Sequence, residues 1–158
     1  MRNRMSRKNC LIKMSGDTIN IDVLHWIKEL SQKYFVVVCV GGGTQINEAF
    51  TTAGFPIGEF GPLGRETKKL EERQLARNIL EKNQAEVQDR LANLGVHASV
   101  VIPVINIGTV LCHVNGDQFI LSAYHGFDVL YIVTTKEREE KKKSLFSRYP
   151  KIQIISFK

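Results

Sequence analysis

The sequence is poor in cysteine, and its three cysteines lie far apart. Cys10, Cys39 and Cys112 each fall inside an apolar run of this 158-residue chain. A small, odd number of scattered thiols argues against a disulfide framework and a structural zinc site. The four histidines also lack metal-ligand spacing, so we expect no metal site. The cysteines predict three buried, reduced thiols in a cytoplasmic protein.

Long hydrophobic runs are also missing. The longest uncharged stretch, residues 91–116, contains Pro103, Gly108 and several polar residues, so it predicts two buried strands and no membrane span. The apolar run after the basic residues 1–9 is short and is interrupted by Lys13, unlike an export signal. The length and the 43% apolar content predict one globular domain over residues 10–158, behind a basic tail of residues 1–9.

The net charge of +6 is concentrated at the two ends of the chain. Residues 1–9 carry +4 and residues 136–158 carry +5, whereas the body between them carries −3. No aromatic residue lies among the basic ones before Phe146, so the ends do not suggest a stacking platform for bases. Solvated termini are the favoured interpretation, and a nucleic-acid interface is the alternative.

Apolar runs alternate with amphipathic segments along the chain. A helix capped by Asn20 or Asp22 is expected before the run YFVVVCV, which is typical of a central parallel strand. Strands are predicted over residues 10–15, 34–40, 97–101, 109–114, 128–134 and 152–157, and further helices over 44–52, 67–94, 119–125 and 137–148. Residues 54–64 predict a long loop. This order predicts an α/β fold, a three-layer α/β/α sandwich with a mostly parallel sheet.

The first candidate site residues follow the first two predicted strands. Lys13 lies in an apolar strand and is followed by Ser15 and Gly16, a pattern that favours a cation directed at phosphate. An edge-strand lysine facing water is the alternative. The turn Gly41, Gly42, Gly43 and Thr44 joins a buried strand to a helix, where free amides can bind an anion. A flexible tight turn is the alternative there.

Two further candidate groups lie at other predicted helix starts. Arg65, at the start of the long helix, can bind a carboxylate or phosphate, or be a solvated charge. Asn115 and Asp117 lie between a strand and a helix, where Asp117 can orient lysines or simply belong to a capped turn. Thr134, Thr135 and Lys136 follow the next predicted strand, and a lysine there can neutralise the charge on a phosphoryl group.

The order of these motifs resembles the amino acid kinase superfamily, the group of acetylglutamate, aspartate, carbamate and uridylate kinases. LIKMSGD is similar to the opening strand of uridylate kinases, and VVVCVGGGTQI to their second strand and glycine loop. GRET is similar to the substrate-arginine motif of acetylglutamate kinases. NGDQFILSAYHGFDVLYIVTTK resembles the passage that carries the family's aspartate and its following strand and lysine.

The resemblance implies an amino acid kinase-like fold and transfer of the ATP γ-phosphoryl group, with Mg²⁺ bound to the nucleotide, to UMP or a carboxylate. Lys13 would stabilise the transferring group, Asp117 would orient the lysines and Arg65 would bind the acceptor. The glycine turn with Ser15, Gly16, Thr44 and Asn115 would bind phosphate or substrate, and Thr134, Thr135 and Lys136 would bind the nucleotide. A homodimer or higher homo-oligomer is also implied.

The chain departs from the family on the nucleotide side. Glu137, Arg138, Glu139 and Glu140 replace the family's nucleotide loop, and the family continues beyond Lys158. The resemblance therefore implies a shortened nucleotide half. The alternative to a kinase is a non-catalytic relative that serves as a nucleotide or small-anion sensor, or as an assembly subunit.

Overall fold

The computed structural model describes residues 7–157, and residues 1–6 of the predicted basic tail lie outside the described part. Within this described part, five parallel strands form the central sheet in the order β5, β2, β1, β8, β9. Their bounds are Ser99–Val101 (β5), Phe35–Val40 (β2), Asn9–Met14 (β1), Val129–Thr134 (β8) and Ile152–Ser156 (β9).

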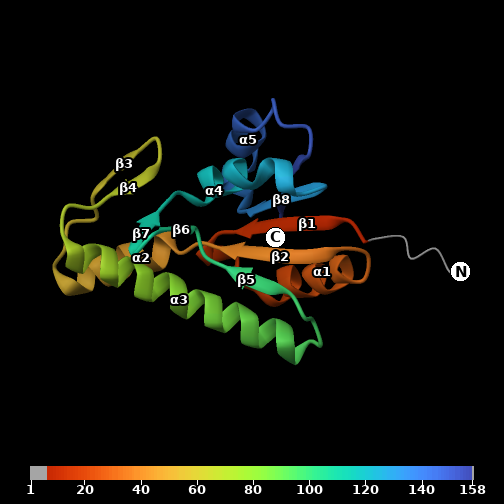
Figure 1. Ribbon diagram of the computed structural model, residues 1–158, viewed down its shortest axis with the longest axis horizontal. Helices are drawn as coiled ribbons and strands as arrows, with labels where there is room; N and C mark the ends of the chain where they lie inside the picture. Colours follow the sequence, from red (N-terminus) through yellow and green to blue (C-terminus); the bar gives the residue numbers. More distant parts are fainter. Residues whose placement is uncertain (1–6, 158) are drawn as a thin grey trace, which may run out of the picture.

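The described residues also form five α-helices, with bounds Ile21–Ser31 (α1), Gly43–Ala53 (α2), Leu70–Asn93 (α3), Gly116–Ala123 (α4) and Lys136–Leu145 (α5). Of these, α2 packs its buried residues Ile46 and Phe50 against α3 and not against the sheet. One face of β1 presents Ile12 and Met14 to α1 and α3. The opposite face presents Leu11 to Ile120 of α4 and to Phe146, just after α5. Figure 1 shows α4 and α5 on one side of the sheet and α1 and α3 on the other. The structure confirms the predicted three-layer α/β fold.

Local sequence signals set several of these boundaries. The Asn20 side chain accepts a hydrogen bond from Val23 N at 3.1 Å, so Asn20 caps α1. The long helix α3 ends just before Gly95, whose φ of +76° lies in the left-handed region that favours glycine. Cys10 and Cys39 are fully buried in the sheet, as predicted.

The segment between α3 and α4 differs from its prediction. It supplies one strand of the central sheet, β5, and then an antiparallel hairpin of β6 (Val104–Ile107) and β7 (Val110–His113). Gly108, with φ +60°, reverses the chain there, so the predicted strand over residues 109–114 pairs with its neighbour outside the sheet. Most of this hairpin is exposed, and Cys112 is therefore half-buried instead of buried.

The predicted loop over residues 54–64 also contains structure. A second short hairpin pairs β3 (Glu59–Gly61) with β4 (Gly64–Glu66), and Arg65 is its central paired residue on β4. Between residues 7 and 157, no helix combines the length and the apolar character needed to cross a membrane.

Candidate functional site

The strand order reverses between β1 and β8, because β1 leads to β2 and β5 on one side and β8 leads to β9 on the other. In open α/β sheets, ligands bind at such a point, beyond the carboxyl ends of the strands. A cavity of about 220 Å³ lies there in this protein. Its walls come from the ends of β1 and β2, the starts of α2 and α4, and side chains of α3, α5 and the two hairpins.

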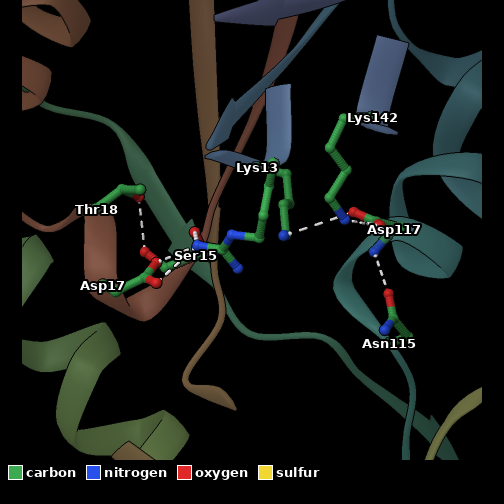
Figure 2. A network of polar contacts seen from close by, with 8 residues as sticks. Lys13, Ser15, Asp17, Thr18, Asn115, Asp117 and Lys142 are labelled. Atoms are coloured by element: carbon green, nitrogen blue, oxygen red, sulfur yellow. Dashed lines mark hydrogen bonds and ion pairs between the residues drawn. The ribbon is translucent and has the colours of Figure 1, made fainter. Parts of the chain in front are cut away.

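Lys13 extends from β1 toward the first turn of α4, and its Nζ lies 3.5 Å from Asp117 Oδ1 (Figure 2). The path of this side chain needs Gly116, because a Cβ there would lie 2.6 Å from Lys13 Cε. Burial lowers the pKa of the Lys13 ammonium group, and the charge of Asp117 partly offsets this effect. Lys13 is thus a buried cation directed at the cavity.

Asp117 has a second cationic partner, Lys142 of α5, whose Nζ contacts Oδ2 (Figure 2). Burial acts to raise the pKa of Asp117, but the charges of Lys13 and Lys142 outweigh burial and hold it below its usual value. The carboxylate stays ionised between two ammonium groups. Counted at their formal charges, the three side chains sum to +1.

Two helix N-termini meet at the same place. Gly42 caps α2, and Asn115 caps α4 through a hydrogen bond from Asp117 N to its Oδ1 at 2.8 Å. Gly41, Gly42, Gly43, Asn115 and Gly116 all line the cavity. Free amides and the positive end of the helix dipole both favour an anion at such positions. Thr44 lies in the first turn of α2 and is not part of the cavity wall.

Ser15 lines the cavity beside a second ion pair. Arg138 of α5 donates to both carboxylate oxygens of Asp17, at 2.8 and 2.6 Å, and its Nη2 lies 3.5 Å from Ser15 Oγ. Gly16 lies outside the cavity wall and packs against Gln45, whose Nε2 donates to its carbonyl at 2.8 Å. Arg138 therefore adds a cation at the end of β1.

Arg65 lines the cavity, but its guanidinium group is already occupied. It donates to Ile57 O and, at 2.6 Å, to Asn47 Oδ1. It also lies over the rings of Phe50 and Phe60, at 5.2 and 4.7 Å from their centroids. These contacts attach the β3–β4 hairpin to α2. Arg65, which was predicted to bind the acceptor, therefore has a structural role in this fold.

The three residues predicted for the nucleotide side do not form part of the cavity wall. Thr134 is buried at the end of β8. Thr135 occupies the N-cap position of α5 without a capping hydrogen bond, and its Oγ1 accepts a hydrogen bond from Arg138 Nε at 3.1 Å. Lys136 is exposed at the start of α5. Lys142, and not Lys136, is the second lysine that Asp117 contacts.

Sequence reasoning missed Arg138, Lys142 and Asn83. The first two belong to a run of charge that the sequence alone assigns to solvent, although their i, i+4 spacing places them on one face of α5. Asn83 lies on the apolar stripe of α3 and is 4% exposed. A polar residue at a core position of the helical repeat was the signal available for it.

No protein-family model matches the chain, and no curated protein matches it. Lys13, Lys142 and Arg138 bring three positive charges, Asp117 and Asp17 bring two negative ones, and two helix N-termini add to the positive side. This arrangement is suited to binding a small anion that carries phosphoryl or carboxylate oxygens.

Proposed function

We propose that the protein is an ATP-dependent phosphotransferase of the amino acid kinase type that acts on a small anionic acceptor such as UMP or a carboxylate. One observation carries the proposal. Lys13 and Lys142 share Asp117 directly beside the glycine turn and the N-terminus of α4. Phosphoryl transfer depends on positioning and charge neutralisation more than on covalent chemistry with the protein, and these residues supply both.

The proposed transfer needs no proton to be removed. An oxygen of the acceptor forms a bond to the γ-phosphorus while the bond from that phosphorus to the β–γ bridging oxygen breaks, and the electron pair leaves on ADP. A carboxylate or phosphate acceptor attacks as an anion, so no general base is required. Lys13 and the amides of Gly42 and Gly43 would stabilise the charge on the transferring group.

The site does not fit a metal ion held by the protein. Within residues 7–157, no three His, Cys, Asp or Glu side chains converge as metal ligands. Asp117 and Asp17 are both committed to cations. Mg²⁺ would therefore arrive bound to the phosphates of the nucleotide, and we assign no step to it.

The test is a ligand panel followed by an assay. Thermal unfolding is measured with ATP, ADP, UTP, UMP, acetylglutamate and carbamate, each with and without Mg²⁺. A ligand present at 100 times its Kd stabilises the native state by about 2.7 kcal/mol. ADP formation is then measured with the acceptors that bind. We expect Lys13→Met to lower kcat/KM about a hundredfold or more, and the exposed Lys28→Met to leave it unchanged.

A second candidate function is anion binding without transfer. Its support is the position of α5, which begins at Lys136 with only Thr135 between it and β8. Arg138 of this helix reaches Asp17, so the helix covers the edge at which the family resemblance implies a nucleotide loop. Pyrophosphate binding by the wild-type chain, with no ADP formed from Mg·ATP and any acceptor of the panel, would favour this candidate over the kinase.

A further inference from the structure

The long helix α3 buries one polar side chain in the middle of its apolar stripe. Its buried residues are Glu72, Ala76, Leu80, Asn83, Val87 and Leu91. Glu72 is explained by the start of the helix, because its Oε2 accepts a hydrogen bond from Lys68 N at 2.9 Å. Asn83 lies more than two turns further on, where burying an amide is costly unless it is hydrogen-bonded.

Asn83 is hydrogen-bonded to the glycine turn. Its Nδ2 lies 2.9 Å from the carbonyl oxygen of Gly41, the first residue after β2. The partner is a carbonyl, so the atom that faces it must be the amide nitrogen, the only donor on this side chain. The other end of Gly41 is also held, since its N–H donates to Met14 O of β1 at 2.8 Å. Both polar groups of Gly41 are therefore fixed.

Fixing the Gly41 carbonyl also fixes the amide of Gly42. The two groups belong to one peptide unit, and residues 7–157 contain no cis peptide bond. In a planar trans peptide, the C=O and the N–H point in opposite directions. The N–H of Gly42 therefore points away from Asn83. Among the described residues, neither Gly42 N nor Gly43 N donates to a backbone acceptor, so both amides are available to a ligand.

The contact between α3 and the turn also explains why Gly42 has no side chain. A Cβ on Gly42 would lie 2.9 Å from Asn83 Nδ2 and 3.3 Å from Leu80 Cδ2. Its φ of −165° lies outside the left-handed region that favours glycine, so crowding by α3 is the feature that leaves no room for a side chain here. A Cβ on Gly43 would meet nothing within 4 Å.

We propose that Asn83 is a positioning residue that holds the Gly41–Gly42 peptide so that the amides of Gly42 and Gly43 face the bound anion. This inference rests on the proposed function only in needing an anion at the glycine turn. Asn83 itself is not part of the cavity wall. It acts through the backbone that it orients.

Gln84 offers a matched control on the same helix. Its Nε2 donates to Val100 O of β5 at 2.7 Å, a bond of the same kind to a strand that does not contribute to the cavity wall. Asn83→Leu and Gln84→Leu each remove one side-chain amide of α3 that donates to a backbone carbonyl. A general loosening of α3 would weaken anion binding in both variants. A positioning role of Asn83 would weaken it only in Asn83→Leu.

The experiment measures the Kd of pyrophosphate by calorimetry for the wild-type chain and both variants, and follows the Gly42 and Gly43 amide signals by NMR. We expect Asn83→Leu to bind about tenfold more weakly, the order expected for a buried carbonyl left without its donor. Its two glycine amide signals should shift less on titration. Gln84→Leu should bind within about twofold of wild type.

The other outcomes distinguish a failure of the Asn83 role from a failure of the anion site. Equal affinities of the two variants would overturn the role of Asn83 and leave the anion site intact. Absence of pyrophosphate binding by the wild-type chain would overturn the anion site, and the positioning role with it. Should Asn83→Leu fail to fold, Asn83→Ala paired with Gln84→Ala gives the same comparison without added bulk.

Discussion

Lys13 and Asp117 form an ion pair between the end of the central strand β1 and the first turn of α4. The Nζ and Oδ1 atoms lie 3.5 Å apart, and the side chains are 10% and 11% exposed. Either charge alone would be costly at this depth, because burial penalises the ionised form. Each residue therefore depends on the charge of the other.

Replacing Asp117 with Asn should destabilise the fold strongly. The change would leave Lys13 and Lys142 together without their shared counter-charge, and breaking a buried ion pair typically costs about 3–5 kcal/mol. Urea unfolding measures the effect. Asp89→Asn, at an exposed position of α3, is the control and should change the free energy of unfolding by less than about 0.5 kcal/mol. Similar values for both variants would contradict the role of the pair.

Acid should lower the free energy of unfolding by protonating Asp117. The pKa of Asp117 is held below its ordinary value of 3.8, so the folded state binds fewer protons than the unfolded state in this range. The stability from Asp117 is therefore fully present above about pH 4 and is lost as the pH falls through its folded pKa. Unfolding measured from pH 5 to pH 2 should show a shallower fall for Asp117→Asn than for wild type. Parallel curves would contradict the depressed pKa.

Gly42 and Gly43 should respond differently to the same substitution. Gly42→Ala places a methyl group against Asn83 and Leu80, and overpacking of this kind costs about 1–3 kcal/mol. Gly43→Ala meets open space at the start of α2 and should leave stability unchanged or raise it by up to about 1 kcal/mol. Thermal unfolding of the two variants distinguishes them, and equal losses would contradict the packing of α3 on this turn.

Arg65→Lys should loosen the β3–β4 hairpin. Lysine keeps the charge but loses the planar group that bonds Ile57 and Asn47 and lies over Phe60. Limited proteolysis of the hairpin should become about tenfold faster, which corresponds to about 1.4 kcal/mol of local stability. Arg73→Lys, exposed on α3, is the control. An unchanged cleavage rate with a raised KM for the acceptor would instead favour the substrate role that the sequence suggests.

Several features of the fold could be predicted from local sequence. The β-branched run that forms β2 and the Asn20 cap of α1 each carry their own signal, because burial on both faces and capping depend on neighbouring residues. The glycine turn and Asn115–Asp117 could be predicted as candidate site residues because each lies where a strand gives way to a helix. The hairpin of β6 and β7 could not be predicted, because an apolar run does not specify the strand with which it pairs.

The sequence by itself determined the class of fold and the positions of Lys13, the glycine turn and Asp117 at the ends of strands. Only the tertiary structure decided the partners of these residues. Lys142 reaches Asp117 because α4 and α5 lie on the same side of the sheet, and Asn83 reaches Gly41 because α3 packs against β2 from the other side (Figure 1). Those contacts join segments far apart in the chain, and they depend on strand order and helix packing, which local patterns do not encode.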